Sequence, residues 1–171
     1  AGTTQLSAIL QDEMLRTHPW YAGFTLLILL GCFSKSAQFP LHFWLPGAMS
    51  APTPASAYLH SATMVKAGVY LLARLYPTLG ETALWQNTLL VVGLATMATG
   101  ALFALRQRDL KASLAYSTIS QLGALTALAS LPEAEGIKAL LIGVIAHSLY
   151  KASLFLMVGA VEHQTDRKSV V

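Results

Sequence analysis

Long apolar runs separated by short polar turns constrain this chain more than any other feature. The clearest run covers residues 82–105, which hold almost no strongly polar side chain apart from Gln86 and Asn87 near the start. A helix needs about 20 apolar residues to cross a bilayer, so 171 residues have room for about five crossings and little else. We therefore expect an all-α, polytopic membrane helix bundle.

The composition excludes several other classes of protein. Hydrophobic residues make up 54% of the chain and charged residues 11%, with a mean hydropathy of +0.55, whereas soluble domains average about 25% charged residues. The net charge of +3 is dispersed rather than gathered in a patch, so no nucleic-acid partner is expected. Cys32 is the single cysteine, and no nucleophile with its base, phosphate loop or metal-ligand cluster is present. We expect no conventional enzyme, no cofactor and no metal.

The polar segments divide the chain into a polar or interfacial lead at 1–18, a transmembrane part at 19–166 and a cytoplasmic tail at 167–171. The expected crossings are 21–34 continued by 39–49, then 52–76, 82–105, 109–131 and 136–161. The lead has the spacing of a short amphipathic helix or a loop. Because the chain lacks an initiator Met and its polar lead has no anchor, we expect a fragment of a larger polytopic subunit.

A lysine and two prolines interrupt the first crossing. Lys35 ends the first apolar run, and Pro40 and Pro46 follow it. Proline lacks an amide proton and clashes with the preceding helical turn, so we predict that the first helix is broken between Lys35 and Pro46. Carbonyls freed at membrane depth are tolerated only where protein or a water-filled cavity surrounds them. Such places are typical of ion paths.

Three lysines, Lys35, Lys66 and Lys151, lie inside the expected crossings. A charged side chain there costs several kcal/mol, so we interpret them as proton-transfer groups, with structural bridging between helices as the alternative. All eight carboxylates lie outside the apolar stretches or at their ends. Either a carboxylate from another helix pairs with each lysine, or burial disfavours its charged form. Both arrangements make a protonation switch.

Two histidines accompany these lysines. His147 and Lys151 are four residues apart, so they share one face of a helix, and imidazole titrates near neutral pH. We interpret this pair as a proton relay, against the alternative that His147 is a satisfied core residue. His60 precedes Lys66 by six residues, about 120° round a continuous helix. We therefore expect His60 to face away from Lys66, towards the path between Lys35 and the fourth crossing.

The fourth crossing holds the remaining candidates. Lys111 lies two residues after Asp109, so it either snorkels to the interface or joins the proton path. A stripe of small or polar residues at helical spacing follows: Ser113, Ser117, Ser120 and Gln121. These side chains either order water along the path, or the small serines let neighbouring helices approach closely.

The basic loops predict an orientation. Arg106, Arg108 and Lys111 lie between the third and fourth crossings, and Arg167 and Lys168 follow the fifth. The positive-inside rule places both groups in the cytoplasm if the broken first element counts as one crossing. A re-entrant first element would turn them outward, so we expect it to span.

Three motifs resemble one known family. They are KSAQFPLHFWLPGAMSAPTPASAYLHSATMVKAGVYLLARL from Lys35, RDLKASLAYSTISQLG from Arg108 and HSLYKASLFLMVGAVEH from His147. Together they resemble the proton-translocating antiporter-like subunits shared by respiratory complex I and the Mrp-type cation/proton antiporters. The resemblance covers roughly residues 25–166. Within the family, His42 and Lys66 are the residues in which this chain resembles the large A subunit of Mrp-type Na+/H+ antiporters.

The resemblance implies proton translocation coupled to antiport of a monovalent cation such as Na+, by a multi-pass protein of the bacterial inner membrane. It implies that residues 19–166 are the transmembrane part of a proton-antiporter-like domain, and that a glutamate from a preceding helix pairs with Lys35. The implied partners are other membrane subunits of a hetero-oligomeric complex, the lipid bilayer, protons and monovalent cations. Two alternatives remain open: a proton-pumping membrane subunit of a complex I-like oxidoreductase or hydrogenase, and a structural membrane scaffold.

Overall fold

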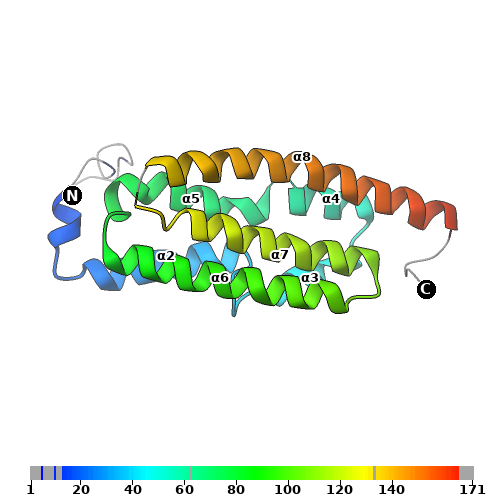
Figure 1. Ribbon diagram of the computed structural model, residues 1–171, viewed down its shortest axis with the longest axis horizontal. Coiled ribbons are helices and arrows are strands. Elements are labelled where there is room, and N and C mark those ends of the chain that lie inside the picture. Colours follow the sequence, from blue (N-terminus) through cyan, green and yellow to red (C-terminus); the bar gives the residue numbers. More distant parts are fainter. Residues whose placement is uncertain (1–4, 6–9, 11–12, 62, 133, 166–171) are drawn as a thin grey trace.

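The computed structural model describes residues 5, 10, 13–61, 63–132 and 134–165, and within these ranges every regular element is helical (Figure 1). In chain order the elements are η1 (Glu13–Thr17), α2 (Tyr21–Lys35), α3 (Trp44–Gly47), η2 (Ala48–Ser50), α4 (Thr53–Ser61), α5 (Met64–Leu79), α6 (Ala83–Arg106), α7 (Leu110–Leu128) and α8 (Ala134–Thr165). The expected all-α bundle is confirmed. Most of the lead at 1–18 and the whole tail at 167–171, with Arg167 and Lys168, lie outside the described residues.

Over the described residues, the helices run back and forth between the two ends of the bundle (Figure 1). At one end, the Tyr21 hydroxyl donates a hydrogen bond to the Leu79 carbonyl oxygen at 2.9 Å. At the opposite end, Met49, Asp109 and Glu162 line one cavity. The broken first element, from α2 to η2, therefore traverses the bundle instead of returning to the end where it began. This agrees with the expectation that it spans.

Two of the passes are long and apolar enough to cross a bilayer as single helices. These are α6 and α8, while α2 is a shorter apolar helix, as judged over the described part of the chain. At 1.5 Å per residue, the 24 residues of α6 extend about 36 Å. The predicted crossings at 82–105, 109–131 and 136–161 agree with α6, α7 and α8 to within four residues at each end.

The predicted break after Lys35 is confirmed, because α2 ends at that residue. The hydroxyl oxygen of Ser36 then accepts a hydrogen bond from the backbone nitrogen of Val69 at 3.0 Å. α5 can approach this closely only because residue 68 is glycine, since a Cβ there would clash with the carbonyl oxygen of Cys32. The first break is thus anchored on α5.

The two prolines occupy different positions in the break. Pro40 lies in the turn that follows α2, and Pro46 lies inside the four-residue helix α3. The backbone nitrogen of Phe39 donates to Thr96 Oγ1 on α6 at 2.9 Å, so a side chain of another helix satisfies this turn. The helix expected to resume over 39–49 is reduced to α3 and η2.

A second break was not predicted. The expected crossing at 52–76 is divided into α4 and α5, and Thr63 at the start of α5 has non-helical dihedral angles (φ −123°, ψ −94°). The carbonyl oxygen of Ser61, the last residue of α4, accepts a hydrogen bond from Lys66 Nζ. The lysine side chain therefore donates to a carbonyl oxygen that would accept a hydrogen bond from a backbone amide if the helix continued.

The end of α5 also differs from the prediction. The helix continues through Pro77 to Leu79, whereas the expected crossing ended at residue 76. The Arg16 guanidinium donates to the carbonyl oxygen of Pro77 at 2.5 Å and to that of Thr78 at 2.8 Å. These bonds satisfy last-turn carbonyls that have no partner within the helix, which explains why one further turn is stable.

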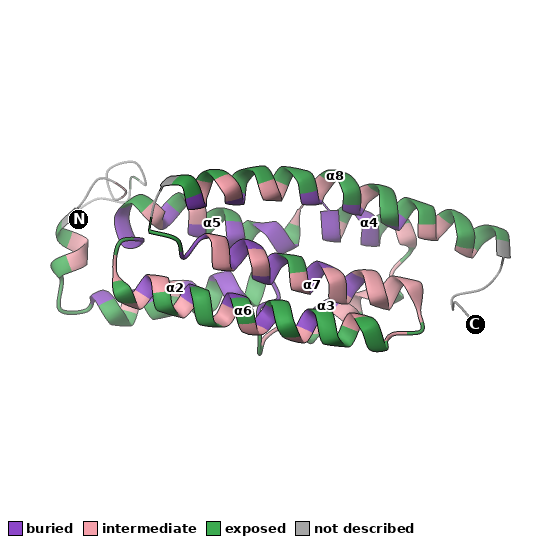
Figure 2. Cartoon of the chain, in the orientation of Figure 1, coloured by how far each residue is buried: buried purple, intermediate pink, exposed green. Residues whose placement is uncertain are grey.

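Glycines bring α6 and α7 into backbone contact. A Cβ on Gly93 or Gly100 of α6 would lie 2.6 or 2.5 Å from a backbone nitrogen of α7, and a Cβ on Gly123 of α7 would lie 2.5 Å from a backbone nitrogen of α6. Figure 2 shows that burial follows the inward face of each helix, with broad exposed strips along α6 and α8.

Candidate functional site

Four titratable side chains are buried together between α4, α5 and α8. Their exposed fractions are 0% for His60, 5% for Lys66, 2% for His147 and 2% for Lys151. His147 interacts electrostatically with the other three. We refer to these four residues as the buried cluster. Among the described residues, no carboxylate forms an ion pair with either lysine of the cluster.

Lys66 reaches from the start of α5 to two neutral acceptors. Its Nζ donates to the carbonyl oxygen of Ser61 and to the hydroxyl oxygen of Ser148. The first acceptor is available because α4 ends at Ser61, and the second lies on α8. The second break therefore places a lysine between a helix terminus and the neighbouring helix.

Lys151 of α8 has equivalent surroundings, supplied by α7. Its Nζ donates to the carbonyl oxygen of Leu114 at 3.0 Å and to the hydroxyl oxygen of Ser117, both on α7. His147 lies one turn before Lys151 and is buried on the same face. The shared face that their spacing predicted is thus confirmed. The His147 ring also meets the Tyr150 ring edge-on, with 5.3 Å between centroids.

His60 lies near the end of α4 and faces α8. Its ring packs against Phe155 of α8, with 4.9 Å between ring centroids, and it interacts electrostatically with Lys151. The angle of 120° assumed a continuous helix, whereas the chain is broken between His60 and Lys66, so the spacing of these two residues does not decide which way His60 faces. Neither ring nitrogen of His60 or of His147 has a hydrogen-bond partner within the described residues.

Lys35 lies outside the buried cluster. It is the last residue of α2, and its side chain is exposed. Within the described residues it has no ion pair with a carboxylate. Its exposure leaves it accessible to a group on another helix, which is the arrangement that the family resemblance implies.

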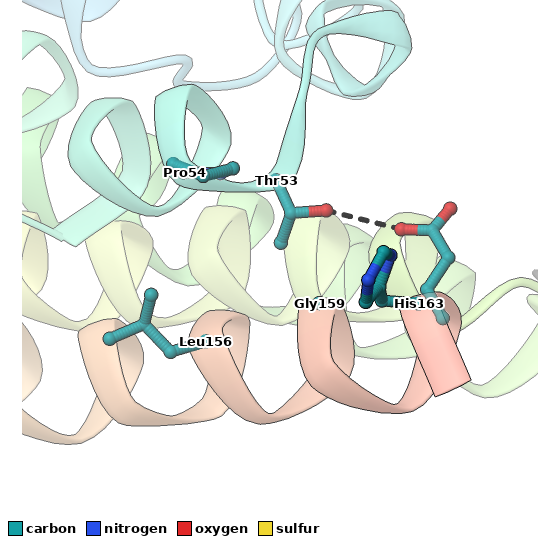
Figure 3. Close-up of a pocket in the computed structure, with 6 residues that line it drawn as sticks. Thr53, Pro54, Leu156, Gly159 and His163 are labelled. Atoms are coloured by element: carbon teal, nitrogen blue, oxygen red, sulfur yellow. Dashed lines mark hydrogen bonds between the residues drawn. The ribbon is translucent and has the colours of Figure 1, made fainter. Parts of the chain in front are cut away.

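Lys111 forms an ion pair with Glu162, with 2.6 Å between Nζ and Oε2. Thr53 Oγ1 also donates to Glu162 Oε2, at 3.1 Å (Figure 3). These contacts join the beginnings of α4 and α7 to the last part of α8. Lys111 therefore has a carboxylate partner at this end of the bundle.

Two cavities adjoin this ion pair at the same end of the bundle. One, of about 570 Å³, is lined by Thr53, Pro54, Leu156, Gly159, Glu162 and His163 (Figure 3). The other, of about 310 Å³, is lined by Met49, Ser50, Asp109, Lys111, Ala112 and Glu162. Glu162 contributes to both cavities.

The predicted polar stripe on α7 is divided between two neighbours. Ser113 donates to the carbonyl oxygen of Ala104 at 3.5 Å, and Ser120 donates to that of Met97 at 3.0 Å, both on α6. Ser117 instead contacts Lys151, and Gln121 is exposed. Two of the serines thus serve helix packing, and one serves a buried lysine.

Three polar contacts of the site had not been expected from the sequence: Ser148, Thr53 and Glu162. Ser148 is adjacent to His147 in the chain, but its role depends on the approach of α5. Lys111 begins one helix and Glu162 lies near the end of the next, and such positions are neighbours when consecutive helices are antiparallel. The positions of Lys111 and Glu162 in the sequence therefore indicated that these two residues would be neighbours.

A bundle of this kind, with titratable groups in its interior, defines a class of polytopic membrane proteins in which such groups mark ion or proton pathways. The chain belongs to the NADH:quinone oxidoreductase/Mrp antiporter transmembrane family, whose model matches residues 1–170.

Relatives of known name are components of antiporters. The chain is 48% identical over 170 residues to the A/B component of a probable K(+)/H(+) antiporter of Rhizobium meliloti (strain 1021), covering 99% of this chain and 17% of that protein. It is 42% identical over 184 residues to the A component of the Na(+)/H(+) antiporter of Alkalihalophilus pseudofirmus (strain ATCC BAA-2126 / JCM 17055 / OF4), covering 99% of this chain and 23% of that protein. The chain therefore spans less than a quarter of either relative.

Solved structures show the same fold. The Mrp complex from Dietzia sp. DQ12-45-1b matches with a TM-score of 0.92 and 50% identity, covering 96% of this chain and 18% of the matched chain. The membrane-bound sulfane sulfur reductase, an archaeal respiratory membrane complex, matches with a TM-score of 0.83 and 26% identity, covering 96% of this chain and 34% of the matched chain. Both are membrane complexes.

Proposed function

We propose that this chain conducts protons within an antiporter component that exchanges them for a monovalent cation such as Na+. The path includes Lys35 and the buried cluster, with Lys111 at one end. The family and the names of the relatives support the class of activity.

One observation carries the proposal: four titratable side chains are withdrawn from solvent in the bundle, and the two lysines among them rest on neutral acceptors. Placing a lysine at membrane depth costs several kcal/mol. A purely structural polar bond between helices would need only a serine or threonine. A group that gains and loses a proton has a reason to be a lysine.

We also propose how the chain lies in the membrane. Residues 19–166 form the transmembrane part of the antiporter-like domain, with 1–18 as the lead and 167–171 as the cytoplasmic tail. The loop from Arg106 to Lys111 faces the cytoplasm by the positive-inside rule. Lys35 takes a carboxylate partner from another helix of the complex. The bacterial relatives support location in the inner membrane, among other membrane subunits.

A second candidate is a proton-pumping membrane subunit of a complex I-like enzyme or hydrogenase. The observation that favours it is the match to the archaeal sulfane sulfur reductase, a respiratory complex, at 26% identity. The identity of 50% to the Mrp complex favours antiport. Neighbouring genes distinguish the two, since small antiporter subunits indicate the first and iron-sulfur subunits indicate the second.

The test is cation-driven proton exchange in membrane vesicles that carry the assembled transporter, followed with a pH-sensitive dye. Lys35→Ala and Lys66→Ala should each abolish or strongly reduce exchange while the protein remains inserted. Lys138→Ala is the matched control, because this lysine is 64% exposed and pairs with Glu135 at the start of α8. Normal exchange in both Lys35→Ala and Lys66→Ala would refute the proposed path and leave the chain as a structural membrane scaffold.

A further inference from the structure

Both buried lysines have the same pair of partners. Each Nζ donates to one backbone carbonyl oxygen and to one serine hydroxyl oxygen, and in each case the serine lies on a different helix from the lysine. For Lys66 the serine is Ser148 of α8, and for Lys151 it is Ser117 of α7. Two lysines on different helices thus have one arrangement in common.

Each serine also uses its own proton. Ser148 donates to the carbonyl oxygen of Val144 at 2.7 Å, and Ser117 donates to that of Leu114 at 2.9 Å. A hydroxyl group has one donor and two acceptor lone pairs. The serine oxygen can therefore accept from a lysine while its proton is held within its own helix.

The two kinds of partner differ when the lysine loses a proton. A neutral amine has a lone pair that accepts a hydrogen bond, and a backbone carbonyl cannot donate one. A serine hydroxyl can donate after rotating about its Cβ–Oγ bond. The serine is therefore the partner that suits both the charged and the neutral lysine, and an unpartnered buried polar group would otherwise cost about 1–3 kcal/mol.

We propose that Ser148 is a positioning residue for Lys66, whose hydroxyl rotates to accept from the ammonium and to donate to the neutral amine, and that Ser117 acts in the same way for Lys151. This inference rests on the proposed function, since it assumes that the lysines change protonation. The serine keeps its own proton: the N–H bond that breaks belongs to the lysine, and its proton and positive charge pass to the next titratable group.

Other titratable groups face Lys66 and bear on any pH profile. His147 of α8 interacts electrostatically with Lys66, and His60 of α4 and Lys151 of α8 interact with His147. From α2, Cys32 is buried near Gly68 of α5. These groups remain unchanged in the variants below, so a difference between variants reports the hydroxyl itself.

The experiment compares Ser148→Ala with Ser153→Ala in vesicles carrying the assembled transporter. Ser153 is a matched control, because its hydroxyl donates to the carbonyl oxygen of Leu149 four residues earlier on the same helix, at 3.1 Å, yet its side chain is exposed. Ser148→Ala should lower the exchange rate about tenfold, the loss expected for one hydrogen bond to a charged group. Ser153→Ala should keep the normal rate.

The pH dependence separates a positioning role from a packing role. Losing the hydroxyl removes more stabilisation from the ammonium than from the neutral amine, because bonds to charged groups are stronger. The exchange profile of Ser148→Ala should therefore move to lower pH by about half to one unit. Ser148→Thr keeps the hydroxyl and should restore both the rate and the profile.

The outcomes are distinguishable. If Lys66→Ala abolishes exchange while Ser148→Ala matches Ser153→Ala in rate and profile, the serine inference fails and the proposed path stands. A slow Ser148→Ala with an unshifted profile, at equal protein in the membrane, would also overturn it. If Lys35→Ala and Lys66→Ala both exchange normally, the proposed path fails and the inference fails with it.

Discussion

Replacing Glu162 with Gln should loosen the end of the bundle where α4, α7 and α8 meet, because one carboxylate oxygen binds both Lys111 and Thr53. The side chains of Lys111 and Glu162 are 15% and 21% exposed. At 2.6 Å and an effective dielectric constant of about 20, their attraction is ~6 kcal/mol, most of it offset by desolvation and side-chain ordering. Exposed pairs contribute about 0–1 kcal/mol, and breaking a buried pair costs about 3–5 kcal/mol. For this partly buried pair we expect about 2 kcal/mol.

A double-mutant cycle with Lys111→Met and Glu162→Gln measures this coupling through apparent melting temperatures of the purified transporter. Each single variant should melt lower, and the double variant should melt higher than the sum of the two losses predicts. The pair Lys138–Glu135 provides the control, because at 64% and 72% exposure it should show a coupling below about 0.5 kcal/mol. Additive losses for Lys111 and Glu162, or a coupling no larger than that of the control pair, would show that the reasoning is wrong.

Three further predictions follow from the cluster and from the helix contacts. Lys66→Arg should not restore the exchange that Lys66→Ala loses, since a guanidinium stays protonated at any usable pH; exchange in vesicles checks this. His147→Ala should slow exchange less than Lys151→Ala, and the double variant should be no slower than Lys151→Ala, whereas additive losses in this cycle would show that the two residues act independently. Gly123→Ala should lower the melting temperature by a destabilisation of about 1–3 kcal/mol, because its Cβ would meet the α6 backbone at 2.5 Å, while Gly31→Ala, with open space around it, should not.

The sequence predicted the passes and the first break because those features depend on local chemistry. An apolar run of sufficient length, or a proline close to a lysine, can be recognised in the sequence without knowing which residues lie nearby in the fold. The second break is different, since residues 52–76 contain no proline or glycine at the interruption. Lys66 stabilises this break, because its Nζ donates to the carbonyl oxygen of Ser61 at the end of α4 and to the hydroxyl oxygen of Ser148 on α8.

The same distinction applies to the candidate site. Spacing alone placed His147 and Lys151 on one helical face, and their burial on that face is confirmed. The position of His60 could not be derived, because helical angles do not carry across an unrecognised break. Ser148 acquires its contact from a residue 82 positions away in the chain, and no local pattern encodes that distance.

The glycine contacts between α6 and α7 bear on how the molecule can move. Where backbone touches backbone, neither helix can slide or rotate without collision, so these two helices are obliged to travel as one rigid body. The contacts among α4, α5 and α8 are of another kind. α4 and α5 are joined at a break, and Lys66 of α5 contacts Ser148 of α8. We therefore expect α6 and α7 to keep their relative positions in any rearrangement of the bundle.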